Sequence, residues 1–266
     1  MTNVGFVGAG RMGAPMVRRL VGAGHEVRAL GRSVEKRRAV SELGAQPVTD
    51  LADVGVAADV VIVCVFTDEQ VQQVCLESVL LSTMRPGASL VIHTTGSPRT
   101  AETIAAEAAA QEIGVVDAPV SGGPHDISAG HVTLFVGGSD DAVERVRPVL
   151  ASYGGPILHV GPIGAGQGVK LINNTLFAAQ IGLLHEAVRL GDRLGIDEPR
   201  LLDAIGHGSA ASRVASIVGA RGSVAAFIEM VGEFVGKDVA VVRKTAAELG
   251  SELGLLDDVI NAGFQG

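Results

Sequence analysis

The stretch Gly161-Pro-Ile-Gly-Ala-Gly-Gln-Gly-Val-Lys-Leu-Ile-Asn-Asn174 divides the chain into two unlike halves. Before it, short apolar runs alternate with helical patterns, which is typical of a parallel sheet covered by helices. After it, nearly all of the patterning is helical, with a long helix expected from Ala165 to about residue 194 and separate shorter helices at about residues 226–234 and 237–249. The sequence therefore predicts a doubly wound α/β domain over residues 1–160, followed by a smaller all-helical domain over residues 161–266.

Within that stretch, Lys170 and Asn174 are four residues apart on a predicted helix, so they share one helix face. Apolar neighbours on both sides indicate that this helix start is partly buried. Burial of a lysine is costly unless it is paired or neutral, and it lowers the lysine pKa towards the range useful for proton transfer. Two interpretations stay open: a functional lysine, or a lysine that extends from a domain junction to solvent.

The composition restricts the partners that the chain can have. Its 266 residues suffice for two modest domains, and the net charge of -8 with 3% aromatic residues argues against nucleic acid or an anionic membrane as partner. No apolar run is long enough to span a membrane, and the first strand begins too early to leave room for a signal peptide. Cys64 and Cys75 lie in apolar patterns typical of reduced core residues, so no metal site is expected. We expect a soluble cytoplasmic protein.

The N-terminal motif predicts a bound dinucleotide. An apolar strand over residues 4–7 is followed by three glycines, a helical pattern and a second strand over residues 26–30. In this Rossmann-type setting the first glycine makes a tight turn, the second lets a pyrophosphate approach the backbone, and the third lets helix and strand pack closely. The alternative is a plain tight turn. The predicted cofactor contacts here are Gly8, Ala9, Gly10, Arg11, Met12 and Gly13.

The end of the second strand indicates which dinucleotide binds. An acidic residue there would hold the 2′-hydroxyl of NAD, whereas an arginine suits the 2′-phosphate of NADP. The chain has Arg32 and Ser33 at this place, a guanidinium and a hydroxyl that can both bind a phosphate. Arg37 and Arg38 are interpreted as part of a solvated charge run. The sequence therefore predicts NADP as the cofactor.

Further polar and glycine-rich segments follow the strands predicted at residues 60–66, 89–93 and 115–117. Because ligands of open α/β sheets lie at the carboxyl ends of the strands, residues just beyond these ends are candidates for the site. The Ser121 hydroxyl with the next two backbone N–H groups would form a small anion nest suited to a carboxylate. The alternative is an ordinary loop that uses glycines to reverse the chain. The candidates at these ends are Val65, Phe66, Thr95, Ser121, Gly122 and Gly123.

Together these motifs resemble the β-hydroxyacid dehydrogenases, a family that includes 3-hydroxyisobutyrate dehydrogenase, tartronate semialdehyde reductase and the glyoxylate/succinic semialdehyde reductases. The resemblance rests on Gly8-x-Gly-x-Met-Gly13, Asp117-Ala-Pro-Val-Ser-Gly-Gly123 and Gly164-x-Gly-x-x-x-Lys170-x-x-Asn-Asn174, with Thr94-Thr95 before Pro98 and the late pair Lys237-Asp238. It implies an oxidoreductase that interconverts a small hydroxy acid and its semialdehyde or keto form. It also implies a catalytic role for Lys170, substrate contacts from Ser121, Gly122, Gly123 and Asn174, and a cofactor contact from Lys237. The apolar helices of the second domain, which lack enough neighbours of their own, separately predict a homodimer or higher homo-oligomer.

The chain departs from the family pattern in three places, one of which is Gly31, where family members often carry Asn before the arginine. Pro124-His-Asp-Ile127 replaces the small residues usual after the second motif, which is expected to alter the rim of the pocket. The sequence also stops at Gly266, whereas family members usually continue through further helices. The far wall of the active site and part of a subunit interface are therefore expected to differ.

Three other functions fit parts of this pattern. An imine reductase of the same fold would carry another proton donor in place of Lys170. A non-catalytic dinucleotide-binding sensor would not need the set formed by Ser121, Lys170 and Asn174. A methyltransferase can share the glycine-rich first turn but has no use for a lysine-bearing helix after the sheet.

Overall fold

The computed structural model describes residues 1–264, and the chain divides into two compact units, Met1–Lys170 and Leu171 onwards. The division lies inside the long helix α9 (Ala165–Arg193), later than the expected boundary at residues 160 and 161. The first turn of α9 is hydrogen-bonded to the sheet unit, which explains the shift. The last two residues of the expected second domain, 265 and 266, lie outside the described residues.

The first unit is built on a nine-stranded sheet within the described residues. Six neighbouring strands, in the order β3-β2-β1-β4-β5-β6, are parallel, which is the strand order of a Rossmann fold and confirms the predicted class. At the β6 edge the sheet becomes mixed, because β8 runs antiparallel to β6 and β7 and parallel to β9. The strands are β1 (Asn3–Val7), β2 (Glu26–Leu30), β3 (Gln46–Val48), β4 (Val60–Val63), β5 (Ser89–Ile92), β6 (Gly114–Asp117), β7 (Val120–Ser121), β8 (Val132–Gly137) and β9 (Gly154–Gly161).

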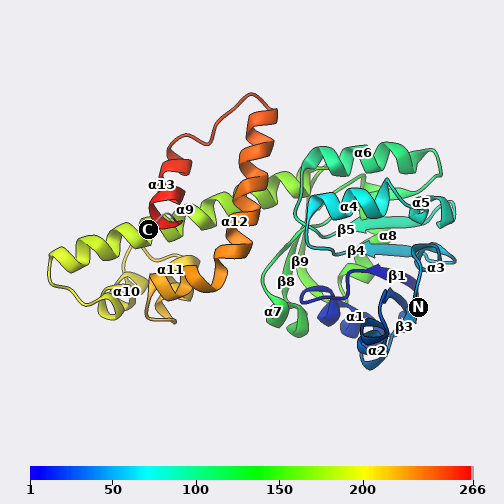
Figure 1. Ribbon diagram of the computed structural model, residues 1–266, viewed down its shortest axis with the longest axis horizontal. Coiled ribbons are helices and arrows are strands. Elements are labelled where there is room, and N and C mark those ends of the chain that lie inside the picture. The colour runs from blue at the N-terminus through cyan, green and yellow to red at the C-terminus, as the bar shows by residue number, and fades with distance from the viewer. Residues whose placement is uncertain (265–266) are drawn as a thin grey trace. The chain divides into compact units, whose positions relative to one another are not determined.

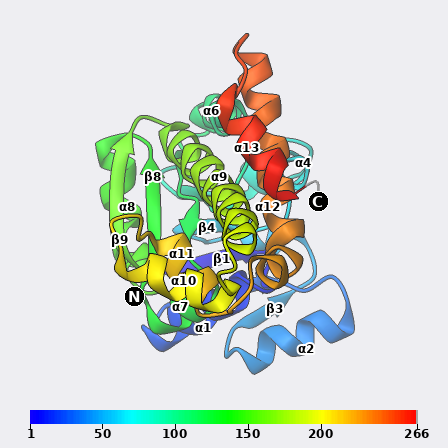
Figure 2. The ribbon, with the colours of Figure 1, turned by 90° about the vertical axis from the view of Figure 1, so that its left-hand side faces the viewer.

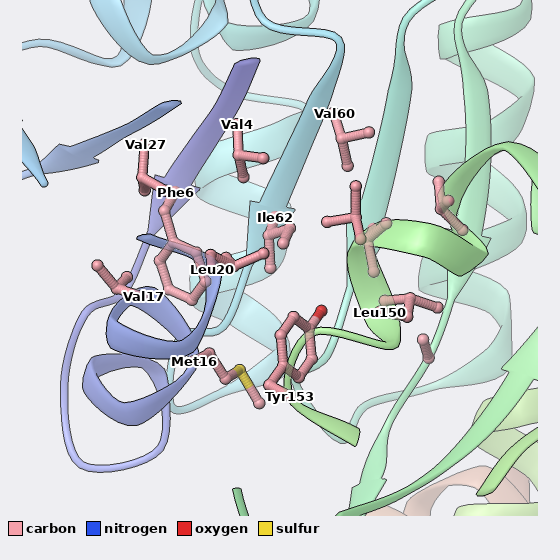
Figure 3. Close-up of a cluster of buried hydrophobic side chains, with 14 of the residues drawn as sticks. Val4, Phe6, Met16, Val17, Leu20, Val27, Val60, Ile62, Leu150 and Tyr153 are labelled. Carbon is pink, nitrogen blue, oxygen red and sulfur yellow. The ribbon is translucent and has the colours of Figure 1, made fainter. Parts of the chain in front are cut away.

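Helices cover both faces of this sheet, and each face has its own apolar cluster. Successive residues of β4 alternate between them: Ile62 packs with α1 and α8, whereas Val61 and Val63 pack with α3, α4 and α6. Figure 3 shows the first cluster, in which Phe6 and Tyr153 are fully buried. The helices of this unit are α1 (Gly13–Gly22), α2 (Val34–Glu42), α3 (Leu51–Gly55), α4 (Asp68–Cys75), α5 (Leu80–Thr83), α6 (Pro98–Ala109), α7 (Pro124–Ala129) and α8 (Asp140–Leu150).

The second unit is all-helical, as predicted, and its helices pack around α9 (Figures 1 and 2). Ile181 and Leu184 of α9 are buried with Phe227 and with residues of the short helices α10 (Glu198–His207) and α11 (Arg213–Gly219). Within residues 1–264 no single helix is both long and apolar enough to cross a membrane, although the bent pair α11 and α12, at 116°, meets those criteria when taken together. The remaining helices are α10 (Glu198–His207), α11 (Arg213–Gly219), α12 (Val224–Glu248) and α13 (Leu255–Phe264).

Helix α12 corrects one expectation. The sequence suggested two helices, at residues 226–234 and 237–249, with a break near Gly236, but the structure has one continuous helix. A glycine costs a helix interior about 1 kcal/mol relative to alanine, which does not break it when packing compensates. Val235 and Val239, on either side of the glycine, are buried on the same helix face and supply that packing.

Candidate active site

The parallel register places the carboxyl ends of β1, β2, β4, β5 and β6 along one edge of the sheet, and the glycine loop begins there. Gly8 has a φ of +100°, and a Cβ added to it would collide with the Cys64 carbonyl. A Cβ on Gly13 would collide with the Gly8 carbonyl and come within 2.8 Å of the Phe6 ring, so helix α1 and strand β1 pack without room for a side chain.

Gly10 differs from the other two glycines. It is exposed, its N–H donates to the Gly8 carbonyl at 2.8 Å, and a Cβ built on it would meet nothing within 4 Å. The space in front of Gly10 is therefore open, at the start of α1, where N–H groups and the helix dipole favour an anion. Arg11 is exposed beside it, and Met12 precedes the first residue of the helix. The loop thus fits the pyrophosphate of a dinucleotide.

The turn after β2 holds two arginines, Arg32 and Arg37, rather than the one expected. Arg32 is exposed, and the Ser33 Oγ accepts the Lys36 N–H at 3.1 Å, so this hydroxyl caps α2 and keeps its own proton to donate. Arg37, interpreted from the sequence as part of a solvated run, is half-buried, and its Nη1 donates to the Gly31 carbonyl at 3.2 Å. Only the last arginine of the run, Arg38, behaves as a surface residue, paired with Glu42.

The loops after β4 and β5 are joined by Thr94, a residue that the sequence analysis quoted in a motif without giving it a role. The apolar run expected to form a strand through Phe66 stops being sheet after Val63, and Phe66 is 44% exposed. The Thr94 hydroxyl accepts the Val65 N–H and donates to the Val65 carbonyl, both at 3.0 Å. Thr94 therefore fixes the Val65 backbone, while the predicted Thr95 lies half-buried next to it.

A buried carboxylate sets the position of helix α9. Asp117, at the end of β6, is fully buried, and its two oxygens accept the N–H groups of Gly164 and Gln167, each at 2.7 Å. Burial raises the pKa of Asp117, while the backbone N–H groups around it act in the opposite direction. The carboxylate thus takes up N–H groups that the first turn of a helix leaves unpaired. The sequence offers one indication of this contact: an acidic residue at the end of an apolar strand is buried, and a buried carboxylate needs hydrogen-bond partners.

Gln167 adds a second tie between α9 and the sheet edge. Its side chain is buried, donating to the Thr94 carbonyl at 2.8 Å and accepting the Gly96 N–H at 3.0 Å. Lys170 follows three residues later, so it lies on the same side of the helix. The predicted catalytic lysine is half-buried and belongs to the sheet unit. Its place is therefore set by Asp117, which binds the start of α9, and by Gln167 in the first turn of α9, which binds the sheet edge.

The expected anion nest at Ser121–Gly123 also contains a carboxylate. The Gly123 N–H, predicted to bind a substrate carboxylate, donates instead to Asp126 Oδ2 at 2.7 Å. Asp126 is the third residue of α7, and it reaches back to the residue before the helix, as acidic residues at that position often do. Gly122 has a φ of +135°, and a Cβ added to it would lie only 2.9 Å from Asp126 Oδ2. The carboxylate of Asp126 therefore lies close to the Gly122 backbone. The loop therefore contains a hydrogen-bond acceptor, the Asp126 carboxylate, next to the donors expected to bind an anion.

A buried histidine supports the start of the same loop. His93 donates from Nδ1 to the Ala118 carbonyl at 2.6 Å and accepts from the Tyr153 hydroxyl at 2.8 Å, an assignment that its neutral form requires. Burial lowers the pKa of His93 to about 4. The ring is therefore neutral at pH 7, and the pair anchors the loop from Ala118 to Gly123.

In the helical unit, Asn174 and Lys237 are joined through Asp238. Asn174 Nδ2 donates to Asp238 Oδ2, and the Lys237 Nζ lies 3.1 Å from Asp238 Oδ1. These contacts link α9 to α12. The sequence pointed to all three residues, but not to the carboxylate as the bridge between the other two.

Comparison with known proteins places the chain in a family. Residues 3–161 match the NAD-binding domain of 6-phosphogluconate dehydrogenase, and residues 164–261 match the NAD-binding domain of NADP-dependent 3-hydroxyisobutyrate dehydrogenase. A probable 3-hydroxyisobutyrate dehydrogenase of Mycobacterium tuberculosis is 36% identical over 205 residues, which is 77% of this chain and 69% of the relative.

Two solved structures agree with this assignment. The M. tuberculosis 3-hydroxyisobutyrate dehydrogenase with L-serine has a TM-score of 0.88 at 29% identity, covering 98% of this chain and 92% of the other. The 3-hydroxyisobutyrate dehydrogenase of Salmonella typhimurium has a TM-score of 0.81 at 26% identity with the same coverage. The chain is a member of the β-hydroxyacid dehydrogenase family, whose enzymes are NAD(P)-dependent oxidoreductases.

Proposed function

We propose that this enzyme uses NADP(H) to interconvert a small hydroxy acid and its semialdehyde or keto form, with Lys170 as general acid and base. The observation that carries the proposal is the double attachment of the α9 start to the sheet edge, which holds Lys170 in a defined place. A lysine with no part in the chemistry would not need its helix start fixed by a buried carboxylate and a buried amide.

The preference for NADP rests on the turn after β2. Arg32 is exposed, Arg37 lies across the turn, and Ser33 keeps a hydroxyl proton to donate. A charge-assisted bond to the 2′-phosphate contributes roughly 1.5–3 kcal/mol, which is about ten- to hundredfold in selectivity. We expect the Arg32→Ala substitution to lower kcat/KM with NADPH while kcat/KM with NADH stays nearly unchanged. A wild-type preference for NADH would contradict the proposal.

The chemistry divides between the cofactor and the chain. When bound, the nicotinamide supplies or accepts the hydride at the substrate carbon. Lys170 then donates a proton to the carbonyl oxygen on reduction and takes it back on oxidation, because an ammonium can release a proton that a guanidinium keeps. Asn174 is on the same face of α9, one turn away, and would orient the substrate oxygen. Lys237 stays a predicted cofactor contact.

A homodimer is proposed from the surface of α9. Four large apolar residues are exposed along this helix and a fifth directly follows its last residue, and such a surface marks an interaction site. A second copy of the chain is the expected partner, because most soluble oligomers are symmetric assemblies of one chain. Light scattering at micromolar concentration tests this, and a strict monomer would contradict it. The residues are Ile172, Leu176, Leu183, Leu190 and Leu194.

The deciding experiment follows NADPH oxidation with small semialdehydes and keto acids, including succinic semialdehyde and glyoxylate. We expect Lys170→Ala to lower kcat by roughly 10²–10⁴-fold while NADPH binding, followed by fluorescence, stays unchanged. Lys170→Arg should not restore turnover. Near-normal turnover of the alanine variant on a good substrate would show that the lysine is structural.

A further inference from the structure

We propose that Asp68, at the start of α4, is a positioning residue that holds the segment Thr94–Ser97 for the nicotinamide half of the cofactor, and that Gly96 is its matched partner. The inference rests on the proposed cofactor contact of Thr95. It goes beyond that contact by giving a role to two residues outside the predicted site.

The Asp68 carboxylate joins the first turns of α4 and α6, two helices that lie side by side (Figure 1). Its Oδ1 accepts the Ser97 N–H at 3.2 Å, and its Oδ2 accepts the Thr100 hydroxyl at 2.6 Å and the Gln72 side-chain amide at 3.2 Å. Both helix starts are positive ends of a helix dipole, which favours a carboxylate between them. Asp68 therefore ties the loop after β4 to the loop after β5.

The segment Thr94–Ser97 is held from two sides. Gln167 binds its first carbonyl and its third N–H, and Asp68 binds its fourth N–H. Thr95 lies between these contacts and is half-buried, and within residues 1–264 no hydrogen bond joins it to another residue. The two attachments therefore present the hydroxyl and the N–H of Thr95 in one defined place.

Gly96 is the residue that lets Asp68 come so close to this segment. It is buried, and a Cβ built on it would collide with Asp68 Oδ1. Its φ lies outside the left-handed region, so the glycine is needed for space and not for its backbone conformation. Because the carboxylate occupies the space that a side chain would need, substitutions of Asp68 and Gly96 should not act independently.

The strand order indicates which half of the cofactor depends on the segment. The loop after β1 fits the pyrophosphate, and the turn after β2 fits the ribose of the adenosine half. Strands β4 and β5 lie on the other side of β1 from β2. A dinucleotide that crosses the sheet at the pyrophosphate therefore extends its nicotinamide half to the loops after β4 and β5. A change at Asp68 should weaken the contacts of the nicotinamide and spare those of the adenosine half.

The test measures by calorimetry the binding of NADPH and of 2′-phospho-ADP-ribose, which lacks only the nicotinamide ring. We expect Asp68→Ala and Gly96→Ala each to weaken NADPH binding by roughly tenfold or more, and binding of the ring-less analogue by less than about twofold. Asp68→Asn keeps an oxygen for the Ser97 N–H and should restore most of the affinity for NADPH. Asp141→Ala, at an exposed position in the first turn of α8, is the matched control and should change neither affinity.

The double variant Asp68→Ala/Gly96→Ala tests the pairing. It should bind NADPH no more weakly than Asp68→Ala alone, because the new methyl group takes the space that the carboxylate leaves. Losses that multiply would overturn the pairing.

Two other outcomes would overturn the inference. An equal loss of both ligands makes Asp68 a helix cap only, and unchanged binding of both leaves it without a role at the site. Gly96→Ala is judged by the same ratio if Asp68→Ala does not fold. None of these measurements needs turnover, so they decide the inference even if no hydroxy acid is oxidised. If the enzyme prefers NADH, NADH and ADP-ribose take the place of the two ligands.

Discussion

Asp117→Asn tests the claim that a buried carboxylate positions the proposed catalytic helix. The amide keeps one acceptor and places a donor where the second oxygen was, so the N–H of Gly164 or of Gln167 loses its partner. A buried donor without a partner costs roughly 1–3 kcal/mol, and the lost bond to a charged acceptor contributes roughly 1.5–3 kcal/mol. Burial raises the pKa of Asp117, so removing its charge also removes a desolvation cost and offsets part of that loss. We expect the free energy of unfolding to fall by about 2–4 kcal/mol.

The expected loss can be measured in two ways. For a unit of this size it lowers the Tm by about 5–15 °C in a thermal melt. Because Lys170 lies one turn beyond Gln167, a small shift of the α9 start should also lower kcat by about 10- to 100-fold with KM for the cofactor little changed. Asp53→Asn, at an exposed position in α3, is the matched control and should alter neither quantity. If Asp117→Asn keeps both the Tm and kcat, the carboxylate does not position the helix.

Two further predictions follow from the sheet unit. His93 is buried neutral with a pKa of about 4, whereas the unfolded chain takes up this proton near pH 6.5, so stability should be complete above that pH and fall by about 3 kcal/mol as the pH drops to 4. Denaturant unfolding at several pH values should show this slope in the wild type and a flatter one in His93→Gln; equal slopes would contradict it. Gly10→Ala should keep the Tm, since its Cβ meets nothing within 4 Å, but should weaken dinucleotide binding at least tenfold. Gly13→Ala should lower both the Tm and the affinity for the dinucleotide, because its Cβ collides with the Gly8 carbonyl. A Gly10→Ala variant that binds NADPH normally would argue against a pyrophosphate at this loop.

Local patterns were sufficient to predict the fold class and the position of the dinucleotide loop. The strand at residues 26–30 and the helix from Ala165 were predicted closely because alternation and helical periodicity are properties of short segments. Helix α12 was predicted in two pieces because a glycine suggests a break when its neighbours are unknown. The packing of Val235 and Val239, which keeps the helix continuous, depends on residues from other helices.

The contacts that position the candidate site were not predictable in the same way. Asp117 meets the start of α9 across 47 positions of sequence, and Gln167 meets Thr94 across 73. Arg37 was assigned to a solvated run because the sequence does not show that its guanidinium folds back onto the Gly31 carbonyl. Each of these residues is polar and lies where burial needs a partner. Periodicity shows that a partner is required, but the tertiary fold determines which one it is.

Asp126 shows how a local departure from a family pattern can change the chemistry of a site without changing its fold. As the third residue of α7 it stabilises the helix by accepting the Gly123 N–H, so the substitution of a small residue by an acid is tolerated by the backbone. The same bond removes one donor from the loop and adds a negative charge beside the other two. Asp117 and Gln167 fix the place of Lys170 through contacts outside this loop, so the position of the proposed proton-transfer group does not depend on Asp126. We therefore expect substitutions in α7 to alter the proposed substrate loop without moving Lys170.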